Sequence, residues 1–382
     1  MPNRSAHEKI FRYDTVLDAG DICNLSREAE RIRSGIAKKE KLVVYGRRNS
    51  GKTSLVKSVI IPGFRKAGRN RFVLFCDLMQ VKDLASIGRR LQVSFSQAFH
   101  DAFPGRAFLE GVERYLAGLR PVMRMDPLTG EPSFSFDALD AGHEGGVIGI
   151  LNVIREKILR DKEGLLILDE FQDISLVAEA QGLMREALQS FGDTPMILMG
   201  SKKHLLGAMF GKPEAPFADF GTDIEFGDIP YDEYREYILE RFRPSGLSLS
   251  EEVSKTWQDL LFRNAEAINN VGAHLVERFR HKKIEERDVR LAIDAVVEER
   301  GSRFEEILTA CSPSDERVLV AIARRGPIPQ PSSKKFLAHL NLAHATVNKC
   351  VRRLWDGGFI EKTTAGYRLS NPLLHYFVLK HR

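Results

Sequence analysis

The sequence has only four cysteines, and their positions disfavour both a disulfide framework and a zinc site. Cys23, Cys76, Cys311 and Cys350 lie far apart, with no C-x-x-C pair and no Cys/His cluster. Zinc sites usually take Cys or His ligands at short, characteristic spacings, and disulfide frameworks occur in small secreted chains that are dense in cysteine. We therefore expect a protein of a reducing compartment.

The sequence also lacks long hydrophobic runs. No apolar stretch approaches the roughly 18 residues of a membrane span, and the opening residues MPNRSAHEKIFRYD contain no apolar signal-peptide core. Of the 382 residues, 43% are hydrophobic and 29% are charged, which is ordinary for a globular protein of about two or three domains. We expect a cytoplasmic protein without a membrane partner.

Positive charge is concentrated in one part of the chain. Residues 301–382 carry 13 Lys and Arg against 6 Asp and Glu, a net charge of +7, so the rest stands at −2 within a total of +5. A basic segment of this kind is the electrostatic footprint of a nucleic-acid-binding module.

A phosphate-binding loop is the strongest pattern in the sequence. An apolar run at residues 42–45 is followed by GRRNSGKT at residues 46–53, which fits G-x-x-x-x-G-K-[ST], and helical Leu/Val/Ile spacing starts at Ser54. Strand, Gly-rich loop and helix in this order predict backbone N–H groups arranged around nucleotide phosphates. The predicted binding residues are Gly46, Arg47, Arg48, Asn49, Ser50, Gly51, Lys52, Thr53 and Ser54.

Two residues of this loop have predicted roles beyond backbone contact. We expect Lys52 to reach the β- and γ-phosphates and Thr53 to ligate Mg²⁺. The alternative is a chance match in an ordinary strand–turn–helix, which the intact flanks disfavour.

Polar residues follow two further apolar runs. Residues 165–168 (LLIL) predict a strand buried on both faces, and Asp169 and Glu170 come directly after it. We expect Asp169 to join the Mg²⁺ ligands and Glu170 to polarise the attacking water; the alternative for Asp169 is a helix N-cap. Ser201 follows the run at residues 196–199 and is, with equal weight, a γ-phosphate sensor or a turn serine.

Four segments, GRRNSGKTSL, LLILDEFQD, MILMGSKKHLLGAMFG and DIPYDEYREYILERF, resemble in this order the archaeal-type ATPase family. That family lies among AAA+ and STAND P-loop ATPases and is similar in layout to archaeal origin-recognition ATPases. The resemblance covers residues 18–297. It implies an AAA+-like parallel α/β core with a helical lid, binding of ATP and Mg²⁺, and a sensor role for Ser201.

The chain departs from this family in its basic residues. Where the family usually carries Gly-Arg, this chain has Gly211 and Lys212, and Lys cannot form the bidentate fork of an arginine finger. Lys202, Lys203 and Arg241 are alternatives for a residue that reaches a neighbour's γ-phosphate. In the lid, Arg263 and Asn269 lack the usual sensor pattern and are not assigned that role.

We expect a P-loop ATPase core at residues 1–228, a helical lid at 229–300 and a winged helix-turn-helix domain at 301–382. Phe11, Tyr13 and Ile22 precede the first strand, and we interpret them as core residues rather than adenine contacts. Prolines and a turn at residues 128–131 predict an inserted hairpin or loop region within residues 103–146, whose role is open.

Three helices at residues 314–325, 332–340 and 345–355 precede a hairpin that turns at residues 365–366, the order of a winged helix. Outside the apolar stripe of the third helix we expect a duplex-DNA contact, with Lys362, Thr363 and Thr364 of the wing near phosphates. The predicted residues of that helix are Thr346, Asn348, Lys349, Arg352 and Arg353. Winged helices also bind proteins, and a basic face is often only solvated, but the +7 charge favours duplex DNA.

The combined prediction is an enzyme that converts ATP and water to ADP and phosphate, with slow or partner-dependent turnover allowed for. Its nucleotide state would control a basic winged helix on duplex DNA. The alternative is a STAND-type signalling switch that holds nucleotide as a closed monomer and contacts a protein. Self-assembly and an unidentified protein partner both remain open.

Overall fold

The computed structural model describes residues 10–116, 121–125, 132–136 and 144–382. They form two compact units. The core unit comprises residues 25–47 and 52–227, and the C-terminal unit comprises residues 228–382 with the segment that ends at Asn24 and residues 48–51. No helix within the described ranges is long and apolar enough to cross a membrane.

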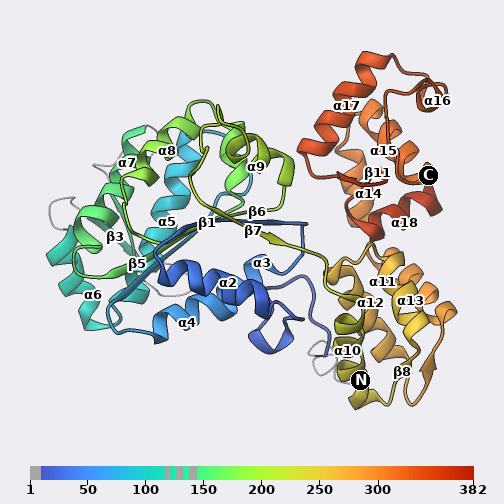
Figure 1. Ribbon diagram of the computed structural model, residues 1–382, viewed down its shortest axis with the longest axis horizontal. Helices are drawn as coiled ribbons and strands as arrows, with labels where there is room; N and C mark the ends of the chain where they lie inside the picture. The colour runs from blue at the N-terminus through green and yellow to red at the C-terminus, as the bar shows by residue number, and fades with distance from the viewer. Residues whose placement is uncertain (1–9, 117–120, 126–131, 137–143) are drawn as a thin grey trace. The chain divides into compact units, whose positions relative to one another are not determined.

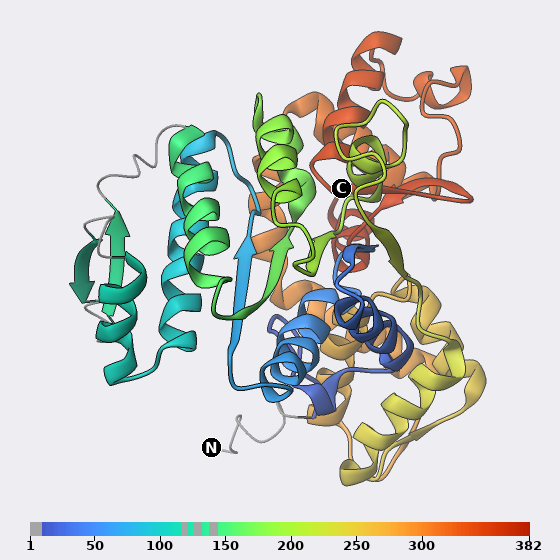
Figure 2. The same cartoon turned by 60° about the vertical axis from the view of Figure 1, so that its left-hand side comes forward.

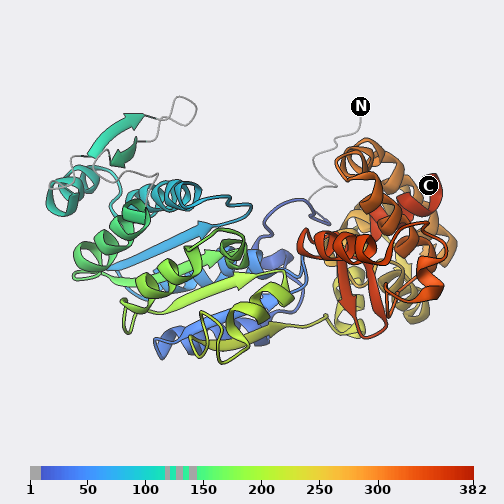
Figure 3. The same cartoon turned by 90° about the horizontal axis from the view of Figure 1, so that it is seen from above.

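The core unit is built on a five-stranded sheet in the order β2-β5-β6-β1-β7. All four strand pairs are parallel, and the strand arrows in Figure 3 point the same way. The apolar residues 165–168 are fully buried, as expected for a strand covered on both faces. The predicted parallel α/β sheet is therefore confirmed. The strands are β1 (Lys41–Gly46), β2 (Arg71–Asp77), β5 (Glu163–Asp169), β6 (Met196–Gly200) and β7 (Thr222–Phe226).

Helices cover both faces of this sheet (Figure 1). The helices α2 to α4 lie on one face, while α5, α7 and α8 lie on the other with a large buried cluster of Phe, Leu and Ile. The helices are α2 (Ser26–Ala37), α3 (Lys52–Leu55), α4 (Ile61–Lys66), α5 (Leu84–Ala102), α6 (Arg106–Gly111), α7 (Glu144–Val153), α8 (Ala180–Gln189) and α9 (Lys203–Phe210).

The chain also contains shorter helical turns, some of them in each unit. The turn η2 (Val56–Ile60) is a π-helical link between α3 and α4, just before Pro62, which has no N–H for an ordinary helical hydrogen bond. The others are η1 (Ala19–Asp21), η3 (Val112–Leu116), η5 (Ile154–Ile158), η6 (Phe171–Leu176) and η7 (Arg243–Ser245).

The predicted inserted hairpin is present as β3 (Pro121–Met125) and β4 (Pro132–Phe136), which pair antiparallel with Met123 opposite Phe134. Figure 2 shows the two short strands at the margin of the core unit, beside α6. The turn expected at residues 128–131 lies outside the described residues.

The C-terminal unit contains the lid and the winged helix. The lid elements are α10 (Tyr231–Phe242), β8 (Ser248–Leu249), α11 (Glu251–Leu260), α12 (Ala265–Arg278), β9 (Lys283–Ile284) and α13 (Glu286–Glu299). The winged-helix elements are α14 (Gly301–Thr309), α15 (Pro313–Arg325), α16 (Lys334–Leu337), α17 (His344–Asp356), β10 (Ile360–Thr363), β11 (Gly366–Leu369) and α18 (Pro372–His381). The expected three helices and antiparallel wing are confirmed, whereas the sequence analysis did not predict α14 and α18.

The lid and the winged helix share one hydrophobic core and belong to the same compact unit. The added helix α18 packs against α13 of the lid. The rings of Phe262 in the lid and His375 in α18 lie 5.3 Å apart, and Phe304 of α14 lies 5.4 Å from Phe377.

Residues 10–24 also belong to this unit. Phe11 is fully buried, with ring centroids 6.3 Å from Tyr237 and 5.9 Å from Phe242 of α10. Burying an aromatic ring in this core removes a large apolar area from water. Phe11 is therefore a core residue, as the sequence analysis favoured.

Candidate functional site

The phosphate-binding loop joins the end of β1 at Gly46 to the start of α3 at Lys52. Asn49 and Gly51 both have positive φ, 61° and 84°. Glycine adopts this conformation freely and asparagine tolerates it, so the chain turns back on itself here. Gly46 and Ser54 are buried, whereas Arg48 and Asn49 are exposed.

Lys52 is the buried cation of this loop. Its side chain donates to the carbonyl oxygen of Gly46 over 3.1 Å and to that of Arg47 over 2.8 Å, and only 5% of the residue is exposed. Neutral carbonyls offset the lost hydration of an ammonium only in part, so an anion would stabilise it further. The loop therefore presents a buried positive charge where a phosphate is expected.

Thr53 and Asp169 lie together, although 116 positions separate them in the chain. The hydroxyl of Thr53 donates to Oδ2 of Asp169 over 2.7 Å, and Asp169 is 5% exposed at the end of β5. Burial raises the pKa of Asp169, the bond from Thr53 opposes the rise, and the charge of Glu170 adds to it. A hydroxyl and a carboxylate are oxygen ligands of the kind that Mg²⁺ takes, so these two residues fit a magnesium site.

Glu170 and Ser201 meet where β5 and β6 end. The Ser201 hydroxyl donates to Oε2 of Glu170 over 2.9 Å and lies 3.1 Å from Oε1. Glu170 has a φ of 49°, a left-handed conformation that is uncommon for this residue type. The carboxylate is therefore held beside Asp169 rather than left as a free surface group.

One residue of this cluster, Gln172, is absent from the predicted site. Its side-chain amide donates to Oε2 of Glu170 over 2.5 Å and to Oδ1 of Asp173 over 3.1 Å. Two polar residues two and three positions after the acidic pair, in the string LLILDEFQD, were the available signal. Local spacing did not reveal that both are buried.

Most of the basic residues considered for a trans-acting role are engaged within their own unit. Lys202 pairs with Asp173 at 3.0 Å, and Lys203 pairs with Glu225 at 2.6 Å. Lys212 is exposed and has no ion pair among the described residues.

Three basic or polar residues of the C-terminal unit also have partners in that unit. Arg241 pairs with Asp21 at 3.2 Å and lies over the Tyr237 ring. Arg263 pairs with Asp228 at 3.5 Å, and the buried Asn269 hydrogen-bonds the Tyr237 hydroxyl.

The winged helix presents part of the predicted DNA-contacting set. On α17, Asn348, Lys349 and Arg352 are exposed, Thr346 is half-buried, and the Arg352 side chain is 84% exposed beside Asp356. Lys362 on β10 is exposed and lies over the Tyr367 ring.

Arg353 is placed differently from the rest of that set. Its guanidinium donates two hydrogen bonds to the carboxylate of Asp315 on α15, over 3.1 and 2.8 Å. This bidentate pair ties α17 to α15, so Arg353 has a structural partner that the sequence pattern did not reveal.

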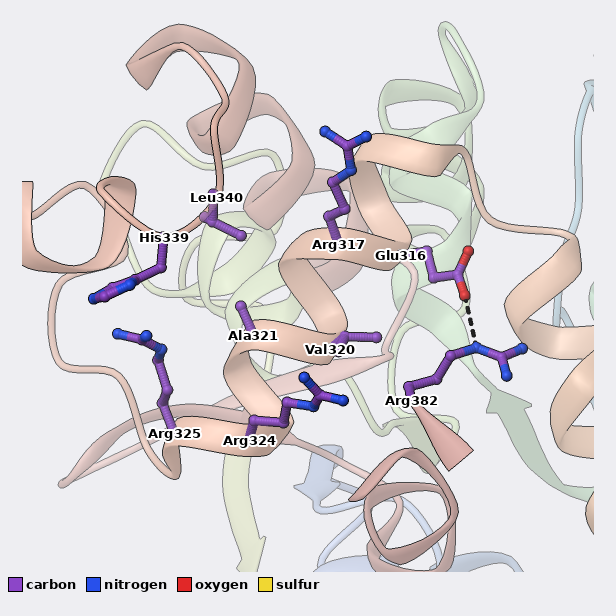
Figure 4. Close-up of a pocket in the computed structure, with 9 residues that line it drawn as sticks. All are labelled: Glu316, Arg317, Val320, Ala321, Arg324, Arg325, His339, Leu340 and Arg382. Atoms are coloured by element: carbon purple, nitrogen blue, oxygen red, sulfur yellow. Dashed lines mark hydrogen bonds and ion pairs between the residues drawn. The ribbon is translucent and has the colours of Figure 1, made fainter. Parts of the chain in front are cut away.

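A groove of about 350 Å³ lies along α15 (Figure 4). Arg317, Arg324 and Arg325 are exposed around it and form no ion pair with any described residue. In Figure 4 Arg325 points toward His339, and Glu316 is joined to Arg382 by an ion pair of 3.1 Å. Half-buried or buried apolar side chains form its floor, namely Val320, Ala321 and Leu340.

Comparison with known proteins agrees with both parts of this architecture. The sequence model of a family described as "Probable winged helix domain" matches residues 302–380. No curated protein sequence matches the chain.

Solved structures match over nearly the whole chain. A Walker-type ATPase of Pyrococcus abyssi is 17% identical with a TM-score of 0.64, covering 97% of this chain and 99% of its own. The Aeropyrum pernix ORC1 protein in complex with DNA is 13% identical with a TM-score of 0.55, covering 100% and 98%. The Aeropyrum pernix ORC2 protein, in ADPNP–ADP complexes, is 15% identical with a TM-score of 0.52, covering 97% and 98%. The chain thus shares the fold of Walker-type and origin-recognition ATPases, as the sequence resemblance implied.

Proposed function

We propose that the protein binds ATP with Mg²⁺ and hydrolyses it to ADP and phosphate. The observation that carries this proposal is the pair of contacts between Thr53 and Asp169 and between Ser201 and Glu170. They gather a metal-binding pair and a base at the carboxyl edge of a parallel sheet, which is where open α/β sheets bind ligands.

In this proposal the loop N–H groups and Lys52 bind the β- and γ-phosphates, while Thr53 and Asp169 hold Mg²⁺. Bound there, Mg²⁺ would neutralise charge on the phosphate oxygens. Glu170 would accept a proton from the water whose oxygen attacks the γ-phosphorus, as the bond from that phosphorus to the ADP oxygen breaks. Ser201, which holds Glu170, would sense the γ-phosphate.

The second part of the proposal is that the winged helix binds duplex DNA. The net charge of +7 over residues 301–382 and the exposed Lys349 and Arg352 on α17 support it. The solved ORC1 structure of similar fold holds DNA. Because the lid and the winged helix share one core, a lid that moves with the nucleotide would carry the DNA-binding surface with it.

The test is ATP hydrolysis measured with and without duplex DNA. Wild type, Lys52→Ala and Glu170→Gln are compared, with the exposed Lys66→Ala as the matched control. We expect Lys52→Ala to lose ATP binding, Glu170→Gln to bind ATP without turnover, and the control to behave as wild type. If wild type and Glu170→Gln both fail to bind ATP, the proposal is wrong.

A second candidate function is a signalling switch whose winged helix contacts a protein. The groove along α15 favours it, because three arginines that form no ion pair within the described part of the chain surround an apolar floor. Phosphates need only the positive charge, whereas an amphipathic acidic protein segment would use the apolar floor as well. In this case the protein would hold its nucleotide tightly as a closed monomer.

The two functions differ in what accompanies nucleotide binding. The DNA-dependent ATPase predicts hydrolysis that DNA stimulates and binding that falls steeply with salt. The switch predicts co-purifying ADP, slow turnover and no response to DNA. An Arg324→Glu/Arg325→Glu variant would retain DNA stimulation in the first case if α17 is the DNA-contacting helix.

A further inference from the structure

We propose that Gln172 is a positioning residue that holds the Glu170 carboxylate in place to receive a proton from water. The inference rests on the ATPase function proposed above and names a residue that acts through Glu170. It does not place Gln172 in contact with the nucleotide.

The side chain of Gln172 is completely buried, and its amide nitrogen lies between two carboxylates. It is 2.5 Å from Oε2 of Glu170 and 3.1 Å from Oδ1 of Asp173. Both neighbours are acceptors, so only the NH₂ end of the amide can face them. The two carboxylates therefore determine which way round the Gln172 amide lies.

The oxygen end of the same amide packs against a glycine. Oε1 of Gln172 is buried without a hydrogen-bond partner among the described residues, and a Cβ on Gly200 would lie 1.9 Å from it. Only glycine at position 200 leaves room for this amide. A buried polar atom without a partner lowers stability and calls for an explanation. The explanation we infer is functional: the same side chain positions the Glu170 carboxylate through its NH₂ group.

A second layer of contacts fixes Gln172 in turn. Asp173, which has a 4% exposed side chain, accepts from Lys202 at 3.0 Å and from the backbone N–H of Gln80 at 2.8 Å. Lys202 follows Ser201 directly, and Ser201 donates to Glu170. The polar contacts therefore form a closed circuit between the ends of β5 and β6, with Glu170 held at two points.

This arrangement leaves Glu170 able to act as a base. A carboxylate has about four lone-pair sites, and the donors at its two oxygens are Ser201 and Gln172. Acceptor capacity thus remains for a water molecule, while the orientation of the carboxylate is determined. Removing Gln172 would leave Ser201 as the single side-chain donor to Glu170 among the described residues and allow the carboxylate to rotate.

The experiment compares Gln172→Met and Gln172→Glu with wild type. Gln172→Met keeps the volume and removes the donor, and we expect kcat to fall on the order of ten-fold to a hundred-fold, as when orienting partners are lost elsewhere. ATP affinity should be unchanged, because Gln172 does not belong to the phosphate loop. Gln189→Met, at an exposed position on α8, is the matched control.

Gln172→Glu keeps the shape of the side chain but places an acceptor oxygen where the NH₂ donor to Glu170 was. We expect kcat to fall in this variant as well, with KM and ATP affinity unchanged, a split between kcat and KM that a general loss of folding would not give. Wild-type kcat in both variants, or an equal change in kcat and ATP affinity, would overturn the inference while the ATPase function stands. A wild type that binds ATP without turnover would instead overturn the hydrolysis proposal, and the inference with it.

Discussion

The hydroxyl of Thr53 donates a hydrogen bond to Oδ2 of Asp169 over 2.7 Å, joining the phosphate loop to the acidic end of β5. Asp169 is almost completely buried, and burial raises its pKa. The bond therefore satisfies an acceptor that has little access to water, and the two oxygens are already together where Mg²⁺ is proposed to bind.

Thr53→Val should lower both the stability of the fold and the affinity for ATP with Mg²⁺. Without the donor, Oδ2 of Asp169 loses the bond from Thr53, while Oδ1 keeps the bond from the backbone N–H of Glu170, and the free energy of unfolding without nucleotide should fall by about 1–3 kcal/mol. Mg²⁺-dependent ATP binding should weaken as well. Thr53→Ser keeps the hydroxyl and serves as the control in chemical unfolding and nucleotide titration; equal stability of Thr53→Val and Thr53→Ser would contradict this role.

Phe11→Ala should destabilise the C-terminal unit rather than affect the nucleotide site. The ring is fully buried against Tyr237 and Phe242, and such truncations cost about 3–5 kcal/mol. Thermal unfolding followed by tryptophan fluorescence is suitable, because Trp257 lies in the same core, 6.0 Å from Phe242. A variant with weakened ATP affinity and unchanged stability would instead indicate an adenine contact.

Arg353→Ala should act mainly on the fold of the winged helix. The bidentate contact with Asp315 links α17 to α15, but the Arg353 side chain is 54% exposed and solvent screens the pair. A double-mutant cycle with Asp315→Ala should therefore show only a weak coupling between the two positions in chemical unfolding. No coupling in the cycle, combined with a large loss of DNA affinity in Arg353→Ala alone, would return Arg353 to the DNA-contacting set.

Lys362 and Arg352 should affect DNA binding in different ways. Loss of a phosphate contact in Lys362→Ala should lower the slope of log affinity against log salt by about 0.9, irrespective of the DNA sequence. Arg352→Ala should reduce discrimination between sequences, because its helix is proposed to enter the major groove. The exposed Lys283→Ala, in the lid, is the control. If neither variant differs from this control, the winged helix does not bind DNA through these residues.

His375 should make the contact between lid and winged helix sensitive to acid. Burial lowers the pKa of His375 below its usual 6.5, and nearby Arg368 lowers it further. The unfolded chain therefore binds a proton at higher pH than the folded one, so stability is fully present above pH 6.5 and declines as pH falls through the folded pKa. Melting temperatures at pH 8, 6.5 and 5 should show a smaller acid loss in His375→Gln; an identical loss in both proteins would assign it to other groups.

Local pattern predicted much of the candidate site. The apolar run at residues 165–168 indicated a doubly covered strand, and the acids that follow it lie at the carboxyl edge of the sheet as expected. The strand at residues 196–199 pairs with the strand at residues 165–168 and ends at the same edge of the sheet, which brings Ser201 to Glu170. Such predictions succeed because a strand's burial and direction are encoded in the residues of the strand itself.

Other features depend on partners that are distant in the sequence. Nothing near Arg353 indicates that Asp315 receives its guanidinium, and nothing near Phe11 indicates the aromatic residues of α10. The buried amide of Gln172 depends on the absence of a side chain at Gly200, on another strand. These relationships follow from the packing of elements, which periodicity in one segment does not record.

The sequence by itself determined the phosphate-loop motif, the acidic pair Asp169 and Glu170, and the buried strand at residues 165–168, because each is a local pattern. Tertiary structure alone decided that Thr53 meets Asp169, that Gln172 holds Glu170, and that lid and winged helix share a core. The physical reason is that burial and pairing depend on which surfaces meet after the chain has folded. That same folding converts a phosphate-binding pattern into an ordered set of charges and hydrogen bonds.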